Sequence, residues 1–353
     1  QVQAMEQQQK RRRLLTQSDI SPLCLPQICN CVTGGCTPKA SRWKGPNPRT
    51  DAVIISEREL ETLSEEERLM LHEDIYGTSI NEMVENEEFV ADKLQQLEFA
   101  IHEIKKKKLK KAYYTAIELE EEQGINYVRS KKFCLMFLRA DKFHVKSAAL
   151  RLITFLAEKL ELFGRSKLLH RIHQTDLDDH DKEVLYSGFL YISNNVDPFG
   201  RLCFVVRRQN LVFHEIVNLK RALFYMMLNS IENDECSQKT GVATMAYNVG
   251  DIDAWSSDFR KIFGQVRKLV LKALPFRVAS YHTCYSQVSE HVVTSFVLFL
   301  MPKDLKLRYQ LHFGSHEKCQ SELSTYGINL DLLPITSEGE YRFEMLVTWL
   351  NEL

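Results

Sequence analysis

Four cysteines near the start of the chain carry the side chains best suited to hold a metal ion. They are Cys24, Cys29, Cys31 and Cys36. Four thiolates can bind zinc in a tetrahedral site, but this spacing matches no recognised zinc pattern, and the chain contains no CxxC pair. Metal binding, disulfide formation, lipidation and an unstructured tail all stay open for this cluster. We assign no metal site from the sequence.

Patterns that mark common catalytic and nucleotide-binding sites are absent. The chain has no GxGxxG loop, no phosphate-binding P-loop and no GxSxG nucleophile elbow. His102, His214 and His316 are each followed by Glu, as in zinc proteases, but none has a second His four residues later. His282 and Cys284 fall on one face of a predicted strand, where we interpret them as buried packing because no orienting acid is evident. We therefore expect no enzymatic activity.

The segment at residues 288–301 has the most unusual physical character. Its second half, Phe296-Val297-Leu298-Phe299-Leu300-Met301, contains no polar residue, whereas a helix that covers a sheet normally keeps a polar face. It is either a fully buried core helix or a helix with one side toward an apolar cavity and the other toward a membrane. The apolar run is too short to span a bilayer, which takes about 20 residues.

The overall composition is that of an ordinary globular protein. The 353 residues are 44% hydrophobic and 26% charged, with a formal net charge of −1. These values exclude a wholly disordered chain and a collagen-like chain. They also exclude an overall positive electrostatic potential that would attract nucleic acid. Nine cysteines are too sparse for a disulfide-dense scaffold, so we expect mostly reduced thiols in an intracellular protein.

Charge and turn residues divide the chain into three predicted parts. Residues 1–50 form a flexible basic arm rich in Pro and Cys, residues 51–165 a helical module, and residues 166–353 a sheet domain. Ser64 and Glu67 are spaced as a helix-capping box. Helical spacing also continues through 131–163 and ends at Gly164. The lysine run at 105–111 is interpreted as a solvated helix face, with a membrane-surface or acidic-partner patch as the alternative.

Strand and helix patterns alternate in the last part. We predict strands at residues 201–207, 241–249, 278–285 and 309–313, with helices at 219–232, 255–274 and 288–301 between them. This alternation indicates an α/β fold with right-handed crossovers and a mostly parallel sheet flanked by helices.

Five short motifs occur in the same order as in a known family. They are Phe133–Phe143 (FCLMFLRADKF) with Ala148 and Ala149, Asp197–Arg201 (DPFGR), Gly241–Val249 (GVATMAYNV), Pro275–Val278 (PFRV) with Tyr281-His282, and Arg308–Gly314 (RYQLHFG) with Ser315. Together they cover roughly residues 131–322. The chain resembles the CRAL-TRIO lipid-binding proteins, a family that includes phosphatidylinositol/phosphatidylcholine transfer proteins, tocopherol transfer protein and retinaldehyde-binding protein.

The resemblance implies an apolar lipid pocket that is floored by the sheet and closed by a mobile gate helix at 288–301. By position, the implied pocket residues are Ala243, Met245, Tyr247, Tyr281, Thr283 and Tyr285. The implied gate residues are Val292, Phe296, Phe299 and Leu300. Arg308 and Tyr309 are candidates for contact with a head group.

Two departures from the family bear on the ligand. Phe276 stands where the phosphoinositide-binding members carry Glu, and Tyr309 stands where they carry Lys. The inositol-binding pair is not kept, so the resemblance favours a different or more apolar ligand. No other cofactor is implied.

The function expected from these observations is lipid carriage. The chain would bind one lipid or other hydrophobic molecule and carry or present it between membranes, as a cytoplasmic protein that is peripheral at membranes. The alternative is a lipid-sensing interaction module without efficient transfer, whose protein partner binds the acidic and lysine-rich N-terminal helices. Nucleic acid is not an expected partner.

Overall fold

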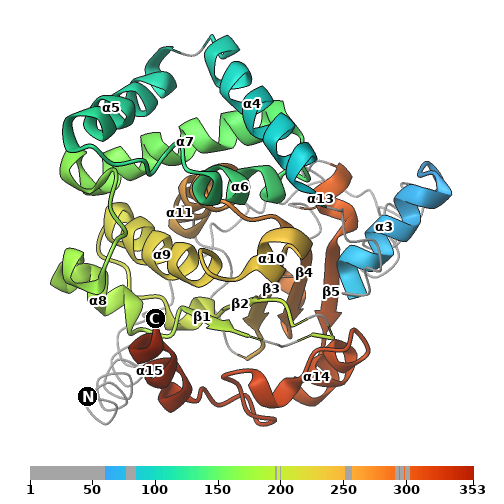
Figure 1. The fold of residues 1–353 in the computed structure, drawn as a ribbon. Coiled ribbons are helices and arrows are strands. Elements are labelled where there is room, and N and C mark those ends of the chain that lie inside the picture. Colours follow the sequence, from blue (N-terminus) through green and yellow to red (C-terminus); the bar gives the residue numbers. More distant parts are fainter. Residues whose placement is uncertain are drawn as a thin grey trace, which may run out of the picture.

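The computed structural model describes residues 60–76, 85–105, 107–194, 197–198, 200–250, 257–290, 294, 298 and 303–353, with backbone alone at 257–261, 263, 303 and 304. Helices come first in the chain (Figure 1). They are α3 (Glu65–Tyr76), α4 (Glu87–Glu103), α5 (Lys107–Gln123), α6 (Lys131–Ala140), α7 (Val145–Phe163) and α8 (Asp179–Leu185). The sheet and its flanking helices follow.

The sheet has five strands in the order β1-β2-β3-β4-β5. They are β1 (Leu190–Ser193), β2 (Cys203–Val206), β3 (Val242–Asn248), β4 (Val278–Tyr285) and β5 (Tyr309–Phe313). β1 is antiparallel to β2, and the other three pairings are parallel. The predicted α/β class and all four predicted strands are confirmed. The short strand β1 was not predicted.

The helices that accompany the sheet connect its strands or follow them. They are α9 (Ile216–Ile231), α10 (Glu235–Thr240), α11 (Ser257–Lys268), α13 (Lys303–Leu307), α14 (His316–Ser324) and α15 (Phe343–Glu352). Short helical turns complete the described chain: η1 (Arg165–Lys167), η2 (Gln174–Asp176), η3 (Arg208–Asn210), η4 (Leu269–Ala273, π-helical) and η5 (Leu330–Leu332).

In the helical module, the predicted capping box is confirmed, whereas the predicted helical pattern over 131–163 is divided into two helices. The Ser64 hydroxyl accepts from the Glu67 N–H at 3.1 Å, and the Glu67 carboxylate accepts from the Ser64 N–H at 2.8 Å, so the predicted capping box starts α3. The helical pattern over 131–163 is interrupted, because Lys142 and Phe143 adopt positive φ angles and separate α6 from α7.

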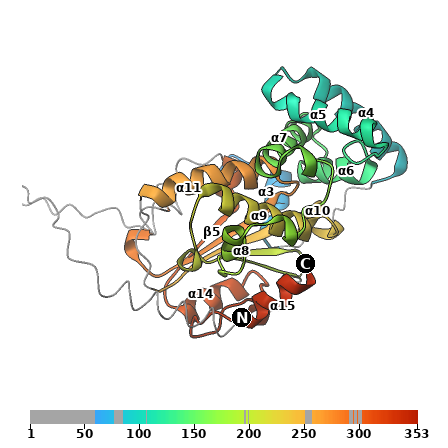
Figure 2. The ribbon, with the colours of Figure 1, turned by 90° about the vertical axis from the view of Figure 1, so that its left-hand side faces the viewer.

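The sheet is covered on both faces by different parts of the chain. β2 to β5 lie in chain order, so right-handed crossovers place all their connections on one face, which we call the crossover face. Figure 2 shows α9 and α11 on that side of the sheet and α14 and α15 on the other. The second face is called the C-terminal face.

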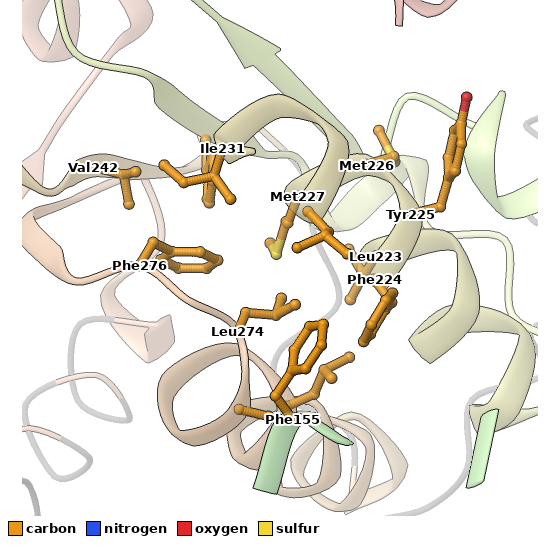
Figure 3. Close-up of a cluster of buried hydrophobic side chains, with 14 of the residues drawn as sticks. Phe155, Leu223, Phe224, Tyr225, Met226, Met227, Ile231, Val242, Leu274 and Phe276 are labelled. Atoms are coloured by element: carbon orange, nitrogen blue, oxygen red, sulfur yellow. The ribbon is translucent and has the colours of Figure 1, made fainter. Parts of the chain in front are cut away.

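One continuous hydrophobic core joins the helical module to the sheet. Its buried residues run from Val90 in α4 to Leu350 in α15. In Figure 3, Phe155 of α7 lies beside Phe224 of α9, with Leu274 and Phe276 from the segment before β4 nearby. The rings of Phe155 and Phe224 are stacked, with centroids 5.2 Å apart. The helical module is therefore packed on the sheet domain.

Within the described ranges, no helix is long and apolar enough to cross a membrane.

Candidate functional site

The register of β3 against β4 decides which side chains share a face. Met245 lies opposite His282, and Ala246 lies opposite Thr283. Paired residues on neighbouring strands point to the same side. Tyr247 lies opposite Cys284 and contacts His316 of α14 on the C-terminal face, so Ala246 and Thr283, one position away on each strand, lie on the crossover face. Its residues on β3 to β5 are Thr244, Ala246, Asn248, Tyr281, Thr283, Tyr285, Tyr309, Leu311 and Phe313.

The predicted pocket residues therefore divide between two faces. Tyr281, Thr283 and Tyr285 lie on the crossover face. Ala243, Met245 and Tyr247 point to the C-terminal face, where the Tyr247 hydroxyl is 3.0 Å from Nδ1 of His316 in α14. No single pocket on one face of the sheet can contain all six residues. On β3, the neighbours of the predicted β4 set are Thr244, Ala246 and Asn248.

Aromatic rings and hydroxyls are concentrated where β4 and β5 meet on the crossover face. Tyr281 and Tyr309 stack with centroids 4.3 Å apart, and the Thr283 hydroxyl donates to the Tyr309 oxygen at 2.9 Å. Burial raises the pKa of both tyrosine hydroxyls, so both stay protonated. The two side chains are nevertheless only partly buried. Tyr309 stands on β5, the edge strand of the sheet, and Tyr281 stands on the neighbouring strand.

A buried polar atom lies further along the same face, where Asn248 is opposite Tyr285. Asn248 ends β3 on the same face and is 9% exposed. Within the described part of the chain, its amide oxygen accepts no hydrogen bond. An unsatisfied buried carbonyl oxygen costs about 1–3 kcal/mol, so a donor supplied by a ligand or water would be favourable there.

A buried ion pair links the start of segment 288–301 to η3. Glu290 pairs with Arg208 of η3, and the two side chains are 2% and 8% exposed. Thr294 and Leu298 are buried, whereas Val288 is 60% exposed. The predicted gate residues Val292, Phe296, Phe299 and Leu300 lie outside the described residues.

Arg308 is engaged by helix α3. Its guanidinium donates to the Asp74 carboxylate at 2.9 Å, and Arg277 lies 2.8 Å from the same carboxylate. Lys142 approaches it at 3.6 Å. Burial of Asp74 opposes its ionisation, but Arg277, Lys142 and Arg308 outweigh that effect and hold its pKa below the usual value. Arg308 therefore ties α3 to the sheet, and Tyr309 is the member of the predicted head-group pair that lies on the crossover face.

The lysine run lines a second candidate site at the turn between α4 and α5. An open pocket of ≈ 810 Å³ is lined there by His102, Glu103, Ile104, Lys105, Lys107, Lys110, Lys111, Tyr114, Thr115, Glu118 and Arg165. Arg165 already pairs with Glu118 and Glu122, and the Lys110 ammonium donates to the His102 carbonyl at 2.5 Å. The remaining lysines are exposed, so the pocket is basic and suited to an anionic group.

The cysteines that the structure describes contribute no evident nucleophile. Cys284 and His282 share the C-terminal face, but burial raises the pKa of the Cys284 thiol well above its ordinary value. His282 Nδ1 is instead 3.1 Å from Nε2 of His312. Cys134, Cys203 and Cys319 are buried too, whereas Cys236 is exposed. Cys24, Cys29, Cys31 and Cys36 lie outside the described residues.

Compared with known proteins, the chain matches no family model and no curated protein sequence.

Proposed function

We propose that this protein binds one lipid or other hydrophobic molecule between the crossover face and segment 288–301, and carries it between membranes. The observation that carries the proposal is the Tyr281–Tyr309 pair, a stacked and only partly buried aromatic surface on the crossover face. The crossover rule directs the apolar segment over this same face, because it leads from β4 to β5. The CRAL-TRIO resemblance independently implies a gate helix there.

Such a carrier needs no covalent chemistry. Burying a 16-carbon chain gains on the order of 12 kcal/mol, at about 0.8 kcal/mol per methylene, so free lipid in water is negligible. A carrier must collect its ligand at a bilayer and shield it in transit, which requires a closed cavity and a segment that opens at the surface. Segment 288–301 has the composition for both tasks, since its second half is apolar all round.

The side chains of the crossover face also suit an amphipathic ligand. The Thr283 and Tyr309 hydroxyls already bond to each other, and the Asn248 amide oxygen accepts no hydrogen bond from any residue that the structure describes. A ligand hydroxyl or ammonium group at Asn248 would satisfy that oxygen while its apolar part lies against the tyrosine rings. This arrangement favours a mostly apolar molecule with one polar end over a highly charged head group.

The test is native mass spectrometry of the purified chain, followed by lipid extraction and a vesicle-to-vesicle transfer assay. We expect a stoichiometric lipid and transfer that is lost in the double variant Phe296→Asp/Phe299→Asp. Phe99→Asp is the matched control, because Phe99 is 63% exposed on α4 and far along the chain from the gate segment. A lipid-free protein that takes up no lipid from vesicles, or full transfer by the double variant, would overturn the proposal.

The basic pocket between α4 and α5 favours a second candidate, a lipid-sensing module that docks on an anionic partner. In that case the protein holds lipid but exchanges it slowly. Substituting Lys107 and Lys111 by Gln would then abolish partner or membrane recruitment without changing lipid occupancy. Measured transfer rates separate the two candidates, because only the carrier exchanges its ligand efficiently.

A further inference from the structure

Two histidines and a glutamate converge at the junction of α8 and α9, away from the sheet. His180 and Glu183 are three residues apart on α8 and so lie on one side of that helix. His214 comes from the loop before α9, and its Nε2 is 2.7 Å from a Glu183 carboxylate oxygen. The rings of His180 and His214 have centroids 4.3 Å apart.

The helices that present these side chains are fixed to each other by a buried polar network. Asp178 and Asp181 form a capping box that starts α8. Asn218 of α9 donates to the Asp181 carboxylate at 2.9 Å, and Arg221 pairs with Asp178 at 3.3 Å. The side chain of Asp181 is fully buried. The position of α8 against α9, which Figure 1 shows side by side, is therefore held independently of the three converging groups.

The geometry points to a metal site, and we propose that His180, Glu183 and His214 bind a divalent transition-metal ion such as Zn²⁺. One ligand atom from each residue lies within 4.8 Å of the other two. Around zinc, with bonds of about 2.0–2.1 Å, neighbouring ligand atoms are about 3.4 Å apart. The side chains of Glu183 and His214 are 48% and 29% exposed, so small χ rotations can close the remaining distance without disturbing the core.

The donor set selects the class of ion. Two imidazole nitrogens with one carboxylate suit Zn²⁺, Co²⁺ or Ni²⁺, whereas Mg²⁺ and Ca²⁺ prefer oxygen ligands throughout. Three protein ligands leave at least one position for water or a further ligand. Within the part of the chain that the structure describes, this is the one group of three such side chains with this proximity. Spacing in the sequence does not reveal it, because His214 is remote from His180 and Glu183 in the chain.

The bound ion would link α8 to the loop that leads into α9. This role is separate from the proposed lipid site, since none of the three residues lies in the sheet or in segment 288–301. Without metal, His214 and Glu183 form an ordinary surface hydrogen bond or ion pair, so loss of the ion should not unfold the protein.

The test is calorimetric titration of the full-length chain with ZnSO₄ after treatment with a chelator. Because Cys24, Cys29, Cys31 and Cys36 are possible zinc ligands, the titration uses a background in which these four are Ser. We expect one ion per chain in this background. Substitution of His214→Ala or Glu183→Gln should weaken binding by at least about tenfold, and His170→Ala, an exposed histidine outside the group, should not change it.

Two further readouts make the result decisive. Zinc should raise the thermal midpoint of the background protein but not of His214→Ala, because only an ion bound to the folded state stabilises it. Co²⁺ should give a visible spectrum that His180→Ala removes. No zinc binding in the serine background, or binding unaffected by all three substitutions, would overturn the proposal.

Discussion

Tyr281 of β4 and Tyr309 of β5 stack with their ring centroids 4.3 Å apart and their planes 16° from parallel. They lie opposite each other in the parallel register, on the crossover face of the sheet. Because side chains stand roughly perpendicular to a sheet, the stacked rings turn their faces toward each other and their edges and hydroxyls away from the strands. This pair is the part of the fold against which the proposed ligand would lie.

Two alanines on β3 offer a matched test of which face holds the ligand. Ala246 points to the crossover face and Ala243 to the C-terminal face, and both are buried. We expect Ala246→Phe to fill the proposed cavity, so that lipid occupancy in native mass spectrometry falls while the chain stays folded. Ala243→Phe should instead overpack the layer beneath α14 and destabilise the chain by about 3 kcal/mol. If both substitutions destabilise the chain equally and Ala246→Phe leaves lipid occupancy unchanged, then the crossover face holds no ligand cavity.

The ion pair between Arg208 and Glu290 should control how readily segment 288–301 moves. Glu290→Gln leaves the Arg208 charge buried without its carboxylate, and we expect a stability loss of about 3–5 kcal/mol in urea denaturation. The double substitution Arg208→Met/Glu290→Met should recover most of that stability, because no charge stays buried. Both variants should release lipid faster than the wild type in the transfer assay. A double variant with wild-type release would mean that the pair has no part in opening.

Asp74 should be the residue that holds α3 on the sheet. Asp74→Asn leaves Arg277, Arg308 and Lys142 without their common carboxylate, so we expect a loss of about 3 kcal/mol and faster hydrogen exchange in α3. The exposed Glu66→Gln on the same helix is the control and should be neutral. The pKa of Asp74 is lowered in the folded state, so its contribution is present above the ordinary value of 3.8 and is lost as the pH falls through the folded value. If Asp74→Asn loses stability at low pH to the same extent as the wild type, this assignment is wrong.

The alternation of strand and helix patterns along the chain was enough to predict strands β2 to β5. Residues 278–285 and 309–313 are bounded by turn and helix signals, and the structure has β4 and β5 at the same limits. β1 escaped prediction because Leu190–Ser193 is four residues long and buried throughout, so it has no alternating pattern to read.

The face of each β3 residue could not be predicted, because it depends on an irregularity between strands. Val242 lies opposite Val278, but Ala243 lies opposite Ser280, so the register shifts by one residue between them. Without the shift, Met245 would lie opposite Tyr281, and the six predicted pocket residues would share one face. A one-residue shift exchanges the faces of all later residues on the strand. No local feature of the sequence predicts this register shift.

The Arg308–Asp74 ion pair and the proposed metal site could not be predicted either, because they also depend on contacts between distant parts of the chain. Arg308 reads as a residue beside a pocket, yet it pairs with Asp74, which lies 234 residues earlier in the chain. The proposed metal site likewise combines His180 and Glu183 of α8 with His214 from the loop before α9. Such groups are set by tertiary packing, which a pattern along the chain does not contain.

The buried histidines of the C-terminal face should make the fold sensitive to mild acid. His282 is 1% exposed, and its Nδ1 is 3.1 Å from His312, whose other ring nitrogen is 3.2 Å from the Glu322 carboxylate. Burial lowers the pKa of His282 well below 6.5, and that of His312 is lowered as well. The unfolded chain therefore binds more protons than the folded chain below pH 6.5, so stability is retained above that pH and lost as the pH falls. Each proton taken up only on unfolding costs about 1.4 kcal/mol per pH unit.

Urea denaturation at a series of pH values between about 7.5 and 5 checks this expectation. The wild type should lose stability with a slope of about one proton or more over that range. His282→Gln should reduce the slope, because the amide can still bond to His312 but does not titrate. His72→Gln is the control, since His72 is exposed on α3 and should leave the slope unchanged. If His282→Gln and the wild type lose stability in parallel, the acid sensitivity originates elsewhere, and the buried histidine pair contributes packing alone.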